Sequence, residues 1–326
     1  MLYIDEAEIR RTFTMRDAIE SDRDAFILQS QGFADAPVRT NFNVEGRGIT
    51  SLMPGYVSKY PRVGIKIVST YPQNAAKGLP AVPATVLLCD ADTGELCAIL
   101  DGTELTRMRT GAVSGLATEL LSNENAEVGA LFGTGGQAFT QLEAMLTVRR
   151  LKEVRVFDKD KSRIVAFLER IAPLAEKFGV AVKAAASSDE AVDNADVITT
   201  VTTSSLPTFD GQKVKKGAHI NAVGVFTPDK RELDEYIVTH ADKIYVDNRD
   251  AVMSEAGDFL IPISEGRFSE EKINGELGDL LLGRCSGRTS PAEITLMKTV
   301  GFATLDIVIA HKVYEKAVAA GRGRNI

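Results

Sequence analysis

Between Glu127 and Asn248, short apolar runs alternate with helical stretches, and this alternation restricts the fold more strongly than any other feature. Segments with helical spacing, such as KSRIVAFLERIAPLAEKFG, lie between several of the runs. Strands that alternate with helices form a parallel sheet that is covered on both faces. The runs, rich in Val, Ile and Ala, are EVGALFG, EVRVFD, VAVKAAA, DVITTVT, AHINAVG and KIYVDN. The sequence therefore predicts an α/β fold with a doubly wound parallel sheet.

The first run leads into LFGTGGQAFTQ, which contains a G-x-G-x-x-A arrangement of Gly133, Gly135 and Ala138. A strand pattern precedes it and a helix pattern, QAFTQLEAMLTVRR, follows it. In such a motif the first glycine allows a tight turn, the second lets the backbone approach a pyrophosphate, and the small alanine lets helix and strand pack closely. A plain strand-to-helix turn would need only the glycines. The combined context favours a Rossmann-type dinucleotide site.

The second run ends in Asp158, at the position where an acid can accept hydrogen bonds from an adenosine ribose. Such an acid would repel a 2′-phosphate, so it favours NAD. Lys159, Lys161 and Arg163 follow closely and could hold that phosphate, which leaves NADP open. The run TTVTTSS would lie at the carboxyl ends of the strands, where ligands bind, although an ordinary Thr-rich loop fits it too.

Three cations upstream stand in otherwise uncharged settings: Arg39, Lys66 and Arg109. Lys66 lies in an apolar, strand-like run, and a buried ammonium needs an acid or a ligand beside it. An arginine offers a planar fork that matches a carboxylate. Together the three would suit a small 2-oxo or 2-imino acid near a nicotinamide. Each alone could equally be a surface or ion-paired cation, and spacing does not show convergence.

The chain's 326 residues are enough for about two domains, and its composition is that of a soluble globular protein. The net charge of -7, without basic runs, argues against a nucleic-acid or membrane partner. The three cysteines and three histidines have no metal-ligand spacing, so we expect no metal. We find no signal peptide and no bilayer-spanning run, and expect a cytoplasmic protein.

Near the C-terminus, SPAEITLMKTVGFATLDIVIAHKVYEKAVAAG has the length and spacing of one long helix that begins at its Ser-Pro pair. We expect this helix to pack on the N-terminal part of the chain. Upstream, TELTRMRTGAVSGLATELLS predicts another helix, with Thr103 as its N-cap.

Several motifs, in order over nearly the whole chain, resemble the ornithine cyclodeaminase/mu-crystallin family. They are Arg39, MPGY at 53–56, K-x-V-S-x-Y-P-x-N at 66–74, RTGA at 109–112, GTGGQA, NAVG at 221–224 and the final GRTSPAEITLMKTVGFATLD. The resemblance implies a homodimer, a Rossmann domain at 119–299, and an α+β substrate-binding and dimerisation domain formed by 1–118 with 300–326.

The resemblance also implies roles for particular residues. Arg39, Lys66 and Arg109 would bind and polarise the substrate, with Lys66 as the catalytic group. The dinucleotide would be held by the glycine loop and by residues after three strands, namely Gly133, Gly135, Gly136, Gln137, Asp158, Thr202 and Thr299.

One position departs from the family's pattern. Cyclodeaminases carry an aspartate two residues after the glycine of NAVG, whereas this chain has Phe226, which cannot act as an acid or base. Thr227 or Asp229 could replace it only through a shifted loop. We expect Glu232 and Asp234, in KRELD, to be solvated charges at a helix start.

We therefore predict an NAD(P)-dependent imino-acid reductase that converts a cyclic ketimine such as Δ1-pyrroline-2-carboxylate to L-proline, or its piperideine homologue. This reaction does not require the missing aspartate. Three alternatives stay open: an ornithine cyclodeaminase, an alanine-dehydrogenase-like enzyme, and a non-enzymatic mu-crystallin-like binder. The presence of Arg39, Lys66 and Arg109 argues for an enzyme. Ring size and physiological direction are not specified by the sequence.

Overall fold

The computed structural model describes residues 1–326, apart from the side chain of residue 75. The chain forms two compact units, Met1–Ala112 with Gly301–Ile326 (unit 1) and Val113–Val300 (unit 2). The division falls inside the helix α3 (Gly102–Leu121), which also contains the boundary expected at residue 118.

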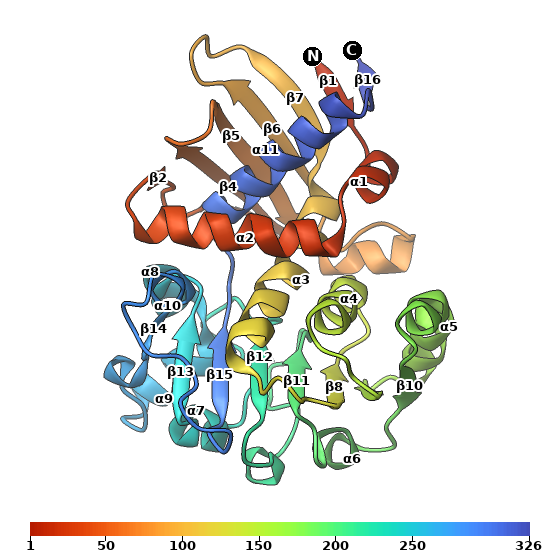
Figure 1. Ribbon diagram of the computed structural model, residues 1–326, viewed down its shortest axis with the longest axis vertical. Coiled ribbons are helices and arrows are strands. Elements are labelled where there is room, and N and C mark those ends of the chain that lie inside the picture. Colours follow the sequence, from red (N-terminus) through yellow and green to blue (C-terminus); the bar gives the residue numbers. More distant parts are fainter. The chain divides into compact units, whose positions relative to one another are not determined.

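Unit 1 contains one mixed sheet with the strand order β16-β1-β7-β6-β5-β4-β2, and β3 pairs with β4. The strands are β1 (Leu2–Ile4), β2 (Ala34–Asp35), β3 (Thr40–Val44), β4 (Gly48–Val57), β5 (Arg62–Thr70), β6 (Ala84–Asp90), β7 (Leu96–Asp101) and β16 (Arg324–Asn325). The helices are α1 (Glu6–Thr12), α2 (Met15–Ser30), the 3-10 helix η1 (Pro72–Lys77) and α11 (Ala303–Ala319). The two chain ends lie side by side, because β1 pairs with β16 (Figure 1).

The helix α11 packs against β4, β5, β6 and α2, and it covers one face of the sheet (Figure 1). Residues on this face alternate with outward-facing ones, as the pleat of a strand requires. In β5, Lys66 and Val68 are buried, whereas Val63 and Ile67 are exposed. The face away from α11 therefore presents apolar side chains.

Unit 2 is a parallel sheet with the strand order β10-β9-β8-β11-β12-β15-β13-β14. Its strands are β8 (Val128–Phe132), β9 (Glu153–Phe157), β10 (Ala181–Ala184), β11 (Val197–Thr200), β12 (His219–Ala222), β13 (Lys243–Val246), β14 (Gly275–Glu276) and β15 (Thr295–Lys298). Its helices are α4 (Ala138–Val148), α5 (Lys161–Phe178), α6 (Ser188–Val192), η2 (Gly211–Lys213), α7 (Glu235–His240), α8 (Arg249–Glu255), α9 (Gly257–Ser264), η3 (Glu270–Lys272) and α10 (Leu277–Leu281).

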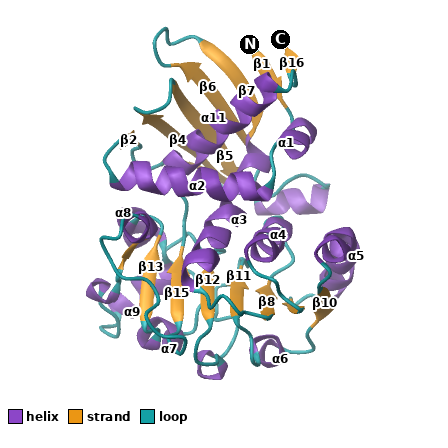
Figure 2. Cartoon of the chain, in the orientation of Figure 1, coloured by secondary structure: helices purple, strands orange, loops and turns teal.

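Both faces of this sheet are buried, as Figure 2 shows by the helices along its strands. One apolar cluster contains Ala130 and Phe132, and a separate one contains Leu131, which points to the opposite face. The chain runs outward from β8 through β9 to β10 and then returns to β11, on the other side of β8. The predicted doubly wound Rossmann fold is confirmed, and its topological switch point lies between β8 and β11.

Two sequence expectations about helices are wrong. The segment predicted as one long helix after residue 285 contains the strand β15, which pairs with β12 and β13, and α11 begins only at Ala303. Gly301, at φ 78°, separates the two elements. Thr103 does not cap α3: its hydroxyl accepts a hydrogen bond from the Ala84 N–H, and the Asp101 side chain accepts from the Glu104 N–H.

No helix within the described part of the chain is long and apolar enough to cross a membrane. Among the same residues, no group of His, Cys, Asp and Glu side chains could hold a metal ion.

Candidate functional site

In unit 2, the glycine-rich loop follows β8 directly. Gly133 has φ 99°, and a Cβ there would lie 2.8 Å from the Val201 carbonyl oxygen, beyond the end of β11. Only glycine fits this turn. At Gly135 and Gly136, by contrast, a Cβ would meet nothing within 4 Å. The loop therefore packs tightly against the neighbouring strand at its first glycine and leaves open space at the next two.

The helix α4 begins immediately after this loop. Its N-cap residue, Gln137, makes no side-chain capping bond, and the Gln137 Oε1 atom is buried without a hydrogen-bond partner. A helix N-terminus that no side chain caps can direct N–H groups and its dipole toward a phosphate. The open glycines and this helix start fit the pyrophosphate of a dinucleotide.

Asp158, just after β9, anchors the glycine-rich loop. Its Oδ2 accepts hydrogen bonds from the Thr134 N–H at 3.0 Å and the Thr134 hydroxyl at 2.7 Å, and its Oδ1 accepts from the Asp160 N–H at 3.0 Å. A carboxylate has about four acceptor positions, so Asp158 keeps room for one ribose hydroxyl. The cations that could oppose this preference, Lys159, Lys161 and Arg163, are exposed.

Two threonines expected at the cofactor site follow other strands of unit 2. Thr202 lies beyond β11, and its hydroxyl oxygen accepts a hydrogen bond from the Ser204 N–H at 3.1 Å. Thr299 follows β15, is buried, and donates its hydroxyl to Asp247 Oδ2 at 2.6 Å. Both stand at the carboxyl edge of the sheet, where ligands of this fold bind.

Glu232 is not the solvated charge that the sequence suggested, because its side chain is 0% exposed. Its Oε1 accepts from the Thr202 N–H at 2.5 Å, and its Oε2 accepts from the N–H groups of Gly224 and Val225 at 2.6 and 3.2 Å. Burial raises the pKa of Glu232 to about 7, against the opposing effect of the Lys298 charge. The charged residues before it, Lys230 and Arg231, gave no indication that the Glu232 side chain is buried. Asp234 is, as expected, at a helix start, where it caps α7.

In unit 1, Lys66 and Arg109 meet at one buried carboxylate that sequence reasoning did not single out. The Lys66 Nζ lies 2.5 Å from Asp306 Oδ2, and the Arg109 Nε lies 3.1 Å from Asp306 Oδ1. Lys66 is 1% exposed and Asp306 is 0% exposed. The acid that a buried Lys66 requires therefore comes from the first turn of α11.

Arg39 lies in the same region. Its Nη2 donates a hydrogen bond to the Gly301 carbonyl oxygen at 2.6 Å. A Cβ on Gly301 would lie 2.5 Å from the Arg109 Nη1, so both arginines lie against this glycine. The structure thus brings Arg39, Lys66 and Arg109 together, which their sequence spacing could not show.

Arg39, Lys66 and Arg109 with Asp306 form a cation cluster, in which Lys66 and Arg109 share one carboxylate. Burial, together with the charges of Arg109 and Arg39, lowers the pKa of Lys66 to about 7, against the raising effect of Asp306. Asp22 of α2 is also fully buried, its carboxyl oxygens have no hydrogen-bond partner, and burial raises its pKa well above the usual range. Lys66 and Arg109, both buried, thus share the Asp306 carboxylate, an arrangement that suits an additional anion such as a ligand carboxylate.

Phe226 lies in the loop after β12 and is 38% exposed. Asp229, further along the same loop, is exposed as well. Phe226 offers no proton-transfer group at the position where cyclodeaminases carry their aspartate.

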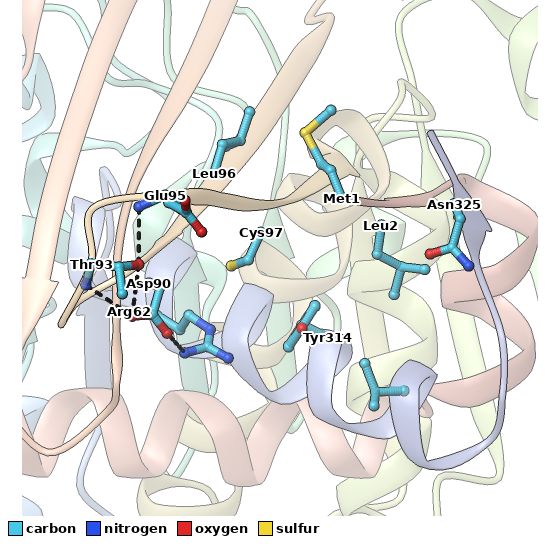
Figure 3. Close-up of a pocket in the computed structure, with 11 residues that line it drawn as sticks. Met1, Leu2, Arg62, Asp90, Thr93, Glu95, Leu96, Cys97, Tyr314 and Asn325 are labelled. Carbon is cyan, nitrogen blue, oxygen red and sulfur yellow. Dashed lines mark hydrogen bonds and ion pairs between the residues drawn. The ribbon is translucent and has the colours of Figure 1, made fainter.

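Unit 1 also contains an open hollow of about 530 Å³. Figure 3 shows the side chains that line it. Its lining includes Arg62, Asp90, Cys97 and Tyr314, and none of Arg39, Lys66 and Arg109. The Arg62 Nη1 already pairs with Asp90 Oδ2 at 3.0 Å. The hollow therefore has no surplus of positive charge for a carboxylate substrate.

Comparison with known proteins relates the chain to a family that contains NAD(P)-dependent oxidoreductases. The model of the ornithine cyclodeaminase/mu-crystallin family matches residues 3–321. A Δ1-pyrroline-2-carboxylate reductase of Bacillus cereus is 37% identical over 327 residues, which cover 100% of this chain and 99% of that protein.

Among the similar solved structures, two match over nearly their full length. One is the Thermococcus litoralis Δ1-pyrroline-2-carboxylate reductase in complex with NADH and L-proline. It matches with a TM-score of 0.96 and 37% identity, and the match covers 100% of both chains. An archaeal alanine dehydrogenase dimer with bound NAD has a TM-score of 0.91 and 31% identity, over 100% of this chain and 98% of that one.

Proposed function

Because the chain belongs to the ornithine cyclodeaminase/mu-crystallin family, we propose that it is an NAD-dependent reductase of cyclic ketimine carboxylates. The expected substrate is Δ1-pyrroline-2-carboxylate, because the 37%-identical Bacillus relative is named as a reductase of this compound. The expected product is L-proline. The observation that carries the proposal is the cation cluster, in which the buried Lys66 and Arg109 share the Asp306 carboxylate and Arg39 binds the nearby Gly301 carbonyl.

The two arginines hold the substrate carboxylate. Arg109 uses its Nε for Asp306, which orients the guanidinium and leaves its terminal nitrogens for a bidentate contact. Arg39, fixed by the Gly301 carbonyl, adds a second positive charge from the adjacent side. An anion at this place would stabilise Lys66 and Arg109, which are buried and share the single carboxylate of Asp306.

Lys66 is the proton-carrying group. With a pKa of about 7, the Lys66 ammonium is close to half protonated at neutral pH and can give its proton to a basic nitrogen. In the proposed reaction Lys66 hydrogen-bonds the substrate carboxylate or supplies the proton of the imine nitrogen. A nicotinamide bound there would supply the hydride for the C=N carbon, and the protein groups would position and polarise the substrate.

We propose NAD as the preferred cofactor, held by Gly133, Gly135, Gly136, Gln137, Asp158, Thr202 and Thr299. The open space at Gly135 and Gly136 and the start of α4 suit the pyrophosphate. Asp158 suits a free ribose hydroxyl and opposes a 2′-phosphate. Calorimetric titration with NADH and NADPH tests this preference: tighter NADPH binding would mean that Lys159, Lys161 and Arg163 dominate.

We propose further that the protein is a homodimer joined through the sheet face of unit 1 that α11 leaves uncovered. Tyr56, Val63 and Ile67 on this face are each 36–38% exposed, and Tyr56 and Val63 are directly paired across β4 and β5. Uncovered apolar patches of this kind are typical of protein interfaces. The similar alanine dehydrogenase structure is a dimer.

A substrate panel tests the reaction class. NADH oxidation is followed with Δ1-pyrroline-2-carboxylate, with its six-membered piperideine homologue, and with pyruvate plus ammonia. The proposal expects a cyclic ketimine to have the highest kcat/KM. Preference for pyruvate plus ammonia would make the chain an alanine dehydrogenase, an activity that its 31%-identical structural neighbour carries.

A further inference from the structure

The buried Glu232 joins the ends of two strands in unit 2. Its two carboxylate oxygens accept the N–H groups of Thr202, after β11, and of Gly224 and Val225, after β12. These are backbone groups at the carboxyl edge of the sheet. Hydrogen bonds to a charged acceptor are about twice as strong as neutral ones, so this carboxylate is a strong tie between the two loops.

A second buried layer holds Glu232 in place. Asp258 Oδ1 accepts from the N–H groups of Glu232 and Leu233 at 2.7 and 2.9 Å. Lys298, at the end of β15, lies 2.8 Å from Asp258 Oδ2 and donates to the Val225 carbonyl oxygen at 2.6 Å. Glu232, Asp258 and Lys298 are each at most 1% exposed. The arrangement is therefore a fixed part of the sheet edge.

One of the two loops that Glu232 joins, the loop after β11, also contacts the glycine-rich loop. A Cβ at Gly224 would overlap the backbone of Thr202, so the two strand ends are in close contact. A Cβ at Gly133 would in turn lie 2.8 Å from the Val201 carbonyl oxygen, next to Thr202. A displacement of the Thr202 backbone would thus be transmitted to the loop proposed to hold the pyrophosphate.

We propose that Glu232 is a positioning residue for the dinucleotide: by holding the loops after β11 and β12, it fixes the wall of the crevice at the switch point. The inference rests on the proposed function, because that function supplies NADH as the ligand. Glu232 itself need not touch the cofactor.

The test compares two carboxylates that both hold backbone N–H groups. In Glu232→Gln, one oxygen becomes an amide donor, which in either orientation faces at least one of the three N–H groups. In the control Asp196→Asn, the altered side chain holds the N–H groups of Glu127 and Val128 at 2.9 Å, at the opposite end of β8. The measurements are NADH affinity by calorimetry, thermal melting, and steady-state kinetics, all at pH 8.

For Glu232→Gln we expect the Kd and KM for NADH to rise by at least about tenfold, with kcat at saturating NADH within about threefold of wild type. Asp196→Asn is expected to lower the melting temperature while leaving the Kd for NADH within about twofold. An unchanged NADH affinity in Glu232→Gln, or an equal loss in both variants, overturns the inference. Wild-type protein that binds NADH but reduces no ketimine would refute the proposed function alone.

A measurement on the wild-type protein does not depend on the variant folding. Hydrogen exchange of the Thr202, Gly224 and Val225 amides is compared with and without NADH. Coupling between the cofactor and the Glu232 contacts predicts slower exchange with NADH at these amides and no change at Glu127 and Val128. Equal exchange rates at Thr202, Gly224 and Val225 in both states would contradict the inference.

Discussion

The Asp306 carboxylate contacts two of the three cations that the sequence singled out, and it stands 240 positions from Lys66. The apolar surroundings of Lys66 predict that an acid or ligand faces it, because an unpaired buried ammonium is costly. Which of the chain's 45 acids does so depends on tertiary structure alone. Glu232 shows the same limit, since charged neighbours in the sequence predicted exposure for a side chain that is fully buried.

We predict that Arg109→Lys lowers kcat/KM for the ketimine by roughly ten- to a hundredfold, with NADH affinity nearly unchanged. A lysine can still face Asp306, but it lacks the fork that grips a carboxylate. Steady-state kinetics, a cofactor titration and a thermal melt check this. Arg62→Lys is the matched control, because Arg62 is also ion-paired but lies outside the cation cluster. Wild-type kinetics in Arg109→Lys would remove this residue from the substrate site.

Lys66 gives a pH-dependent prediction. It carries its proton below its pKa of about 7 and loses it above that value. If Lys66 supplies the imine proton, kcat/KM falls as the pH rises through about 7. In Lys66→Arg the guanidinium stays charged throughout, so this fall disappears and the remaining activity is flat across that range. Rate profiles between about pH 5.5 and 9 test the role, and an identical fall in both proteins would assign it to another group.

At the scale of elements, the least predictable segment was the one that contains both β15 and α11. All four residues of β15 are buried, and a short, fully buried strand cannot be told from a helix by periodicity alone. The strands β8 to β13 were predictable because their apolar runs were separated by turns and helical segments. Gly301, whose φ of 78° marks the break, was visible in the sequence only as one glycine in KTVGFATLD.

Asp306 joins the helix α11 to β5 and α3 through its ion pairs with Lys66 and Arg109, and the contribution of these pairs to the free energy of unfolding can be measured. We predict that Asp306→Asn lowers the free energy of unfolding by about 3–5 kcal/mol, because it leaves buried cations without their counterion. The partly exposed pair of Lys312 with Asp24, at 2.5 Å, links α11 to α2, and Asp24→Asn should cost at most about 1 kcal/mol. Denaturant titration of both variants checks the difference; equal losses would contradict it.

At the scale of the whole molecule, the sequence was enough for the fold and family but not for the connections within the site. Parallel strands, the glycine-rich loop and the family motifs are local patterns, and each keeps its meaning without knowledge of distant contacts. The meeting of Arg39, Lys66 and Arg109 at Asp306 and Gly301 depends on residues from separate segments of the chain. Such a cluster becomes visible only when the sheet and α11 are assembled.

Assembly into a dimer is a whole-molecule property with its own test. We predict that Val63→Glu shifts the protein toward a monomer in light scattering, because it places a charge on the uncovered apolar sheet face. Val165→Glu is the matched control: Val165, on α5 of unit 2, is 59% exposed and lies on no such face. Dissociation by both variants, or by neither, would contradict the proposed interface.

The central claim is that this chain reduces a cyclic ketimine and does not cyclise ornithine. The most direct measurement compares two rates in one preparation: NADH-dependent formation of L-proline from Δ1-pyrroline-2-carboxylate, and ammonia release from ornithine with NAD present. Phe226 cannot take part in proton transfer, whereas the cations around Asp306 are suited to an imino-acid carboxylate. The account predicts rapid, stoichiometric NADH consumption with L-proline as product, and negligible ammonia. Ammonia release at a rate comparable to imine reduction would contradict it and identify the chain as a cyclodeaminase.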